Sequence, residues 1–169
     1  MNQSTMLQKQ VSLDNNLTQS DLQAIEQMVR DVGVFNEEEI RIARELAEDS
    51  LSGKDPDYKF LFLRNKYGVP LAYTCYGVIP LTDNRFDLYW IAVSPKAQGC
   101  GFGKMIMEET EKCIRQLDGK YIYAETSGAS PYRAARALYH KCGFVEASIL
   151  KDFYRDDDDK VIYQKKLEA

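Results

Sequence analysis

The sequence predicts a fold of the α/β (or α+β) class, with a mixed sheet that carries helices on both faces. Two segments with the apolar spacing of amphipathic helices open the chain, and β-rich runs follow them. Two further helical segments then separate later β-rich runs, as the crossover of a β-α-β unit does. Because the chain has 169 residues, we expect one domain over residues 20–169, after an N-terminal segment of residues 1–19.

The N-terminal part of the chain carries helix start and stop residues. Its first segment is polar and forms either a tail or one short strand near Gln10–Leu13. The segment Ser20–Gln23 has the spacing of a capping box and is expected to open a helix that Gly33 ends. Asn36 is expected to cap a second helix, and Gly53 to end it.

Strands are predicted where aromatic and β-branched residues concentrate between turn residues. The turn Asn65–Gly68 and the following Pro70 indicate a hairpin between the first two of these runs. We interpret the acidic run Asp156–Asp159 as a solvated hairpin tip, because it lacks the central glycine of a calcium loop. The predicted strands are residues 58–64, 71–78, 86–93, 121–126, 144–154 and 160–167, and the helices among them are 102–117 and 132–142.

Charge, cysteine content and hydropathy limit the classes of partner. The net charge of −4 argues against nucleic acid and anionic membranes, and it fits a cationic substrate. Four widely spaced cysteines and a single histidine argue against a metal site and for reduced thiols. No signal-peptide pattern opens the sequence, and no apolar run approaches the roughly 18 residues of a membrane span. We therefore expect a cytoplasmic protein without a bound metal.

The loop Gln98–Lys104 is the most informative segment, because it joins a predicted strand to a predicted helix and holds three glycines. A helix N-terminus offers N–H groups and partial positive charge to an anion, and glycine lets the backbone approach it closely. The spacing excludes a P-loop, since Gln98 stands five residues before Gly103 and Met105 replaces the magnesium-binding hydroxyl. It also excludes the G-x-G-x-x-G dinucleotide fingerprint, which leaves the pattern Gln-x-x-Gly-x-Gly.

Together with the preceding Val93–Pro95, this loop resembles the acetyl-CoA loop of the GCN5-related N-acetyltransferases (GNAT). The segment Ala137–Phe144 resembles a second, later motif of that family, although Tyr132-Arg133 stands where the family often has Asn. The resemblance covers roughly residues 58–167. It implies a mostly antiparallel sheet of six to seven strands and acetyl-CoA as co-substrate, and homodimers are common among such proteins.

The resemblance also implies how the cofactor is held. Backbone N–H groups of the glycine loop would bind the pyrophosphate of coenzyme A, and the end of the preceding strand would bind the pantetheine amides. One N–H group would polarise the thioester carbonyl as an oxyanion hole. The cofactor-binding residues implied in this way are Ile91, Ala92, Val93, Gln98, Gly99, Cys100, Gly101, Phe102, Gly103 and Lys104.

Four side chains are predicted to act on the acceptor or on the leaving group. Tyr139 occupies the tyrosine position of the family and would protonate the leaving thiolate, unless it is simply a packed helix residue. Glu125 ends a strand and is the predicted base, with a surface glutamate as the alternative. Asp87 and Tyr89 share a strand face and would bind a cationic substrate. His140 is interpreted as a helix-surface residue.

The sequence therefore predicts an acetyl-CoA-dependent N-acetyltransferase. Its acceptor would be the primary amine of a small molecule, amino acid or peptide, which attacks the thioester directly. The alternative is a non-catalytic acyl-CoA-binding or regulatory module of the same fold, and a plain nucleotide-binding module is a third reading. No motif names the acceptor, although the acidic balance favours a cationic one.

Overall fold

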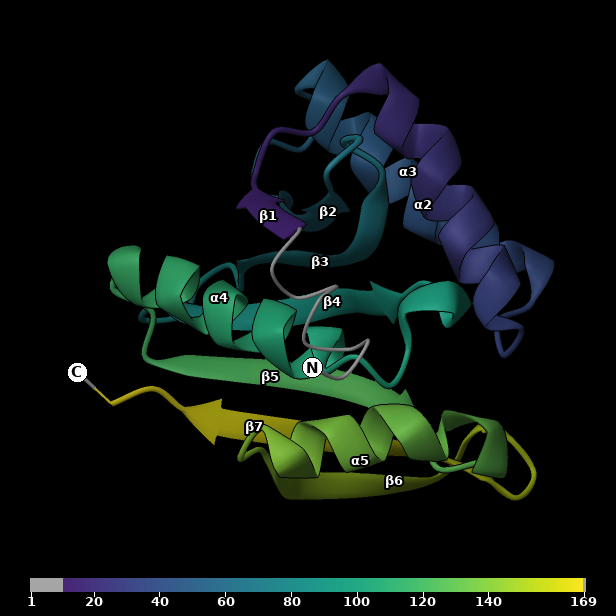
Figure 1. The fold of residues 1–169 in the computed structure, drawn as a ribbon. Helices are drawn as coiled ribbons and strands as arrows, with labels where there is room; N and C mark the ends of the chain where they lie inside the picture. Colours follow the sequence, from purple (N-terminus) through teal and green to yellow (C-terminus); the bar gives the residue numbers. More distant parts are fainter. Residues whose placement is uncertain (1–10, 169) are drawn as a thin grey trace. The chain divides into compact units, whose positions relative to one another are not determined.

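Capping residues and apolar alternation decide where the elements of this chain begin and end. The computed structural model describes residues 11–168 (Figure 1). Short 3₁₀ turns at Pro95–Ala97 and Ser130–Tyr132 precede the last two helices. The helices are α2 (Gln19–Val32), α3 (Glu37–Ser52), α4 (Phe102–Gln116) and α5 (Arg133–Lys141), and the strands are β1 (Val11–Asp14), β2 (Lys59–Asn65), β3 (Pro70–Val78), β4 (Arg85–Val93), β5 (Tyr121–Ser127), β6 (Val145–Arg155) and β7 (Asp158–Lys166).

The strands form a seven-stranded sheet in the order β1-β2-β3-β4-β5-β7-β6. β4 and β5 run parallel, with Asp87 opposite Tyr123, whereas β1–β2, β2–β3, β5–β7 and β6–β7 pair antiparallel. This topology confirms the predicted mixed, mostly antiparallel sheet of the α/β class. β1 also confirms the short N-terminal strand, although Gln10 lies outside the described residues.

Within the described residues, the chain forms two compact units. The first unit holds residues 11–76 and 90–106, and the second holds residues 77–89 and 107–168. β4 begins in the second unit and ends in the first, while α4 begins in the first and ends in the second. The glycine loop therefore belongs to the first unit, and Asp87, Glu125 and Tyr139 belong to the second.

The core of the first unit lies between α2, α3 and one face of the β2–β3 hairpin. In Figure 1 the two helices lie side by side. The apolar side chains of both helices form one buried cluster with Phe62 and Tyr73, which are fully buried. Trp90 is half-buried and packs against this core, with its ring centroid 4.9 Å from that of Phe35. Burial of these rings supplies the main apolar stabilisation of the unit.

The start of α2 differs from the prediction. Thr18, not Ser20, is the N-cap, and the Asp21 carboxylate accepts hydrogen bonds from the Thr18 N–H (2.9 Å) and hydroxyl (2.7 Å). Asp21 is therefore the third helical residue of the capping box, a position that the prediction gave to Gln23. Buried Arg64 fixes the Asp21 carboxylate there. The caps of α3 agree with the prediction: Asn36 accepts from Glu39 N–H at 2.9 Å, and Gly53 ends the helix with φ = 74°.

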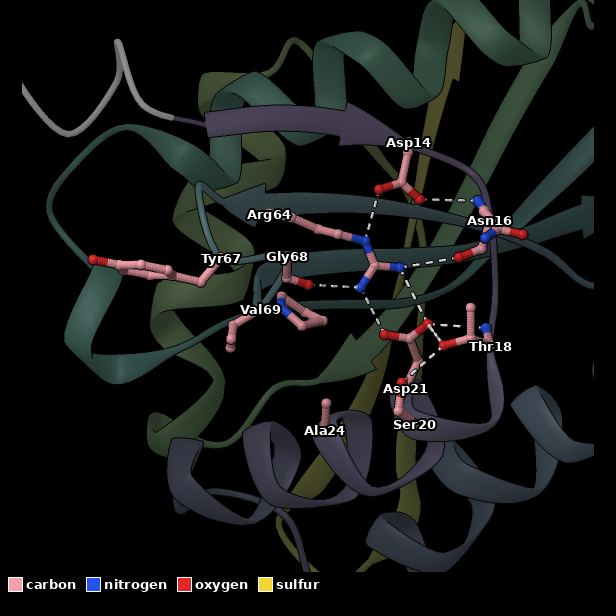
Figure 2. Close-up of a pocket in the computed structure, with 11 residues that line it drawn as sticks. Asp14, Asn16, Thr18, Ser20, Asp21, Ala24, Arg64, Tyr67, Gly68 and Val69 are labelled. Carbon is pink, nitrogen blue, oxygen red and sulfur yellow. Dashed lines mark hydrogen bonds and ion pairs between the residues drawn. The ribbon is translucent and has the colours of Figure 1, made fainter.

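Arg64 holds the first unit together through a fully occupied guanidinium (Figure 2). Its Nε donates to Asp14 (2.7 Å), and Nη1 donates to Asp21 (2.6 Å) and to the Gly68 carbonyl (3.3 Å). Its Nη2 donates to the Asn16 carbonyl (3.0 Å) and to Asp21 (3.1 Å). A guanidinium has five N–H donors, so every donor has an acceptor. Arg64 thus ties β2 to β1, to the start of α2 and to the β2–β3 turn.

These contacts lie in a hollow of about 680 Å³ that opens between β1, α2 and the β2–β3 turn, as Figure 2 shows. Burial would raise the pKa of Asp21, but the hydrogen bonds from Arg64 and Thr18 outweigh it and hold this pKa below its ordinary value. Because the donors of Arg64 are all used, we assign this network a structural role.

The β6–β7 hairpin also differs from the prediction in one respect. Only Asp156 and Asp157 form the turn, while Asp158 and Asp159 already belong to β7. Asp158 is buried and accepts hydrogen bonds from the Ser127 hydroxyl and from Arg155 Nε (3.2 Å). The interpretation of the whole acidic run as a solvated tip is therefore wrong at Asp158, whose carboxylate fixes the hairpin to the end of β5.

Replacement of Arg64 by Met is expected to lower the free energy of unfolding by about 3 kcal/mol, because it leaves the buried Asp21 carboxylate without its partner. Urea denaturation measures the loss. Arg41→Met is the control, since Arg41 pairs with Glu38 and Glu45 on the exposed face of α3 and should hardly change the midpoint. Equal midpoints for the two variants would contradict the structural role of Arg64.

Candidate active site

The glycine loop begins with a short 3₁₀ turn and ends in the first turn of α4. The Ala97 and Gln98 N–H groups close that 3₁₀ turn on the Ser94 (2.8 Å) and Pro95 (3.4 Å) carbonyls. The Gln98 side chain donates to the Val93 carbonyl at 3.4 Å, which braces the loop against the end of β4. Phe102 is buried and anchors the helix start, so the loop is fixed at both ends.

Gly99 and Gly101 have φ values of 77° and 79°, in the left-handed region that favours glycine. An added Cβ on Gly99 would meet no atom within 4 Å, so backbone conformation and not crowding requires glycine there. Both residues are exposed, whereas Cys100 between them is half-buried. Exposed, glycine-flanked backbone at a helix N-terminus fits an anion such as a pyrophosphate. Gly103 and Lys104 lie in the first turn of α4.

The end of β4 supplies the remaining residues of the predicted cofactor site. The parallel register pairs Arg85–Leu88 with Tyr121–Ala124 on β5, and Ile91, Ala92 and Val93 lie outside it. Ala92 is buried, while Ile91 and Val93 are half-buried on the other face of the strand. The prediction that these backbone groups bind pantetheine amides remains a prediction.

Tyr139 lies in α5 and is buried. Its ring centroid is 5.2 Å from that of Tyr163 on β7 and 5.6 Å from that of Phe144. Burial raises the pKa of the Tyr139 phenol. His140, the next residue, is exposed as expected, and its Nε2 lies 3.4 Å from the Glu146 carboxylate.

Asp87, Glu125 and Lys160 form a second group of charges on three neighbouring strands, here called the carboxylate–lysine cluster. Glu125 pairs with the Lys160 ammonium, which also lies 4.2 Å from the centroid of the Phe153 ring. Burial raises the pKa of Asp87, the negative charge of Glu125 raises it further, and Lys160 opposes both effects. The structure thus brings the predicted base and the predicted cation-binding carboxylate together.

The predicted acid and base lie on opposite faces of the β5–β7 pair. Glu125 stands opposite Ile162 in the register, whereas Tyr163, the partner of Tyr139, stands opposite Ala124. Successive side chains of a strand alternate between faces, so Tyr139 and Glu125 are separated by the strands. Tyr89, the other predicted substrate residue, is 37% exposed and shares the face of Asp87.

Comparison with known proteins identifies the family. The acetyltransferase (GNAT) family matches residues 22–144. The chain belongs to the GNAT family of acetyltransferases. A Desulfovibrio desulfuricans protein assigned to the same GNAT family has a similar crystal structure, with 35% identity and a TM-score of 0.88 over 92% of this chain and 98% of that one.

Two other similar proteins match this chain over a shorter stretch or at a lower identity. The ribosomal protein bS18-alanine N-acetyltransferase of Haemophilus influenzae is 40% identical over 67 residues, which are 40% of this chain and 44% of that protein. The match therefore spans less than half of that curated relative. The Salmonella typhimurium protein yncA, solved with its cofactor acetyl-CoA, shares the fold at 16% identity, with a TM-score of 0.74 over 94% of this chain and 95% of that one.

Lys160 is the functional candidate that sequence reasoning missed. The prediction placed it at the start of the last strand and gave it no role, whereas it lies inside β7 and pairs with Glu125. Strand alternation could have placed Lys160 on the same face of the last strand as the half-buried Ile162, two residues later. Only the β5–β7 register shows that Glu125 is its ion-pair partner. Between residues 11 and 168, no group of three or more His, Cys, Asp or Glu side chains is arranged to hold a metal ion, and no helix is long and apolar enough to cross a membrane.

Proposed function

We propose that this GNAT protein is an acetyl-CoA-dependent N-acetyltransferase whose acceptor is the primary amine of a small molecule, an amino acid or a peptide. The observation that carries the proposal is the glycine loop, where Gly99 and Gly101 hold left-handed φ values at the N-terminus of α4. Membership of the GNAT family supports it, as does the named activity of the Haemophilus influenzae relative. A cytoplasmic location is part of the same proposal.

In this proposal the backbone of the first unit holds the donor. N–H groups from Gln98 to Lys104 bind the pyrophosphate, because a helix N-terminus stabilises negative charge. The backbone of Ile91–Val93 binds the pantetheine amides and polarises the thioester carbonyl. When bound, acetyl-CoA supplies a thioester: the amine forms a C–N bond to its acyl carbon, the C–S bond breaks, and sulfur takes the electron pair.

Carboxylate and phenol side chains handle the protons in this proposal. An alkyl ammonium has a pKa of about 10.4, so it must lose a proton before it can attack. A carboxylate of the carboxylate–lysine cluster binds the ammonium and accepts that proton. Tyr139, whose raised pKa keeps the phenol neutral, donates a proton to the leaving sulfur.

Coenzyme A is expected to raise the melting temperature by about 5–10 °C at about 100 times its Kd, because it stabilises only the folded state. ATP is the control, since it lacks the pantetheine arm. Thiol release from acetyl-CoA is then followed with a panel of amines, including a peptide with an N-terminal alanine. The absence of any shift with saturating coenzyme A would reject the proposal, and binding without thiol release would favour the non-catalytic module.

Gly99→Ala is expected to weaken coenzyme A binding, measured by calorimetry. The added Cβ strains the left-handed φ and stands on the exposed side of the loop, where the pyrophosphate would approach the backbone. The strain alone should cost about 1 kcal/mol of stability. Gly53→Ala is a matched control: Gly53 has φ = 74°, meets no atom within 4 Å and lies at the end of α3. Both variants should lose similar stability, and an equal affinity of both for coenzyme A would remove Gly99 from the cofactor site.

Tyr139→Phe is expected to lower kcat about 100-fold, as the loss of a general acid does, and to leave the Kd for acetyl-CoA nearly unchanged. The phenyl ring keeps the packing against Phe144 and Tyr163, so the variant should fold normally. Single-turnover kinetics and a binding titration separate the two effects. Unchanged turnover would leave Tyr139 as a packing residue only.

A further inference from the structure

The carboxylate–lysine cluster lies on the more exposed face of β4, β5 and β7. Residues flanking each member are buried on the other face: Leu88 beside Asp87, Ala124 beside Glu125, and Val161 beside Lys160. The register sets Asp87 opposite Tyr123 on β5, two residues before Glu125, and sets Lys160 opposite Ser127, two residues after it. Three strands thus deliver two negative charges and one positive charge to one face.

Lys160 is held more tightly than a lysine on a strand face usually is. Its side chain is 15% exposed, whereas that of its partner Glu125 is 48% exposed. The ammonium is held between the Glu125 carboxylate and the face of the Phe153 ring, 4.2 Å from the centroid. Lysine rarely loses this much water contact unless its charge is compensated. The position of the Lys160 charge is therefore fixed by two other strands.

This arrangement makes the two carboxylates unequal. Glu125 has a cation in direct contact, whereas Asp87 is half-buried and is influenced by that cation at longer range, with no ion pair of its own in the described part of the chain. Alternation places further ionisable groups on this face: Arg85 and Tyr89 on β4, Tyr121 and Tyr123 on β5, and Asp158 and Lys166 on β7. The Arg85 guanidinium lies 5.4 Å from the centroid of the Tyr121 ring. Asp87 therefore sits where an incoming ammonium finds negative charge that no ion pair within the cluster has neutralised.

We propose that Lys160 is a positioning residue of the acceptor site, which holds Glu125 in an ion pair and leaves Asp87 to accept the proton of the acceptor amine. This inference rests on the proposed function and moves the base role from Glu125 to Asp87. The acceptor R–NH₃⁺ gives one proton to the Asp87 carboxylate and becomes R–NH₂, whose lone pair forms the C–N bond. As this bond forms, the C–S bond of the thioester breaks, and sulfur takes the electron pair and the proton of Tyr139. Asp87 returns the first proton to solvent, the new amide nitrogen gives its second proton to solvent, and Tyr139 regains its proton from solvent.

The first test needs no activity. The carboxyl ¹³C resonances of Asp87 and Glu125 are titrated in the wild type, in Lys160→Met and in Lys160→Arg, and Asp87→Asn and Glu125→Gln assign them. Without the lysine charge, the pKa of Asp87 should rise further above its ordinary value, because Lys160 opposes the repulsion from Glu125. Lys160→Arg should restore the wild-type titration. Lys151→Met is the control, since exposed Lys151 on the same hairpin pairs with Asp159 instead.

The second test uses the pH profile of kcat/KM for the best amine of the panel. Lys160→Met should move the acidic limb to higher pH by the same amount, and Lys160→Arg should return it. Asp87→Asn should lower kcat/KM about 100-fold or more, as the loss of a general base does, and Glu125→Gln should lower it less.

The outcomes separate this inference from the proposed function. An unchanged Asp87 titration in Lys160→Met overturns the inference whether or not the protein is active. A larger loss in Glu125→Gln than in Asp87→Asn also overturns it and returns the base role to Glu125. If the Asp87 titration shifts but no amine releases thiol from acetyl-CoA, the coupling stands and the proposed function fails.

Discussion

The parallel pairing of β4 with β5 is the constraint from which the proposed site follows. Parallel neighbours cannot be joined by a hairpin, so the chain crosses over, and it does so through α4. The end of β4 therefore runs into a helix N-terminus, and the left-handed Gly99 and Gly101 allow that tight connection. The same pairing sets Asp87 beside β5, near Glu125. One strand pair thus determines where the glycine loop begins and where the carboxylates lie along the strands.

Local chemistry made most of the fold predictable. The bounds of α3 and α4 and of the strands follow from residues within a few positions of each other: caps and apolar spacing for the helices, and alternation for the strands. Gly33 and Gly53 end their helices with φ values of 78° and 74°. The start of α2 was predicted wrongly because two acceptable N-caps, Thr18 and Ser20, stand close together. The choice between them depends on Asp21, whose carboxylate is held by an arginine 43 residues away. Local propensity carries no information about such a partner.

The candidate site, like the fold, has parts that local sequence predicts and parts that depend on residues far away in the sequence. A motif with fixed spacing predicted the glycine loop, and strand alternation predicted that Asp87 and Tyr89 share a face. Alternation names the face of a side chain but not its neighbour across the sheet, which only the register supplies. The pairing of Lys160 with Glu125 and the burial of Asp158 both depend on the β5–β7 and β6–β7 registers. Neither could be derived from the acidic run itself, which reads as a solvated turn.

Two charged networks in this chain show why the number of charges does not reveal a role. Arg64 uses all five N–H donors on acceptors of its own unit, so a ligand could bind it only by breaking a contact that holds the fold. The carboxylate–lysine cluster has fewer cations than carboxylates. Lys160 neutralises Glu125, and half-buried Asp87 lies near that pair without a cation of its own within the cluster. A second cation would complete the cluster without displacing the first. Saturation of the donors therefore separates a structural network from one that is prepared for an exchangeable ammonium.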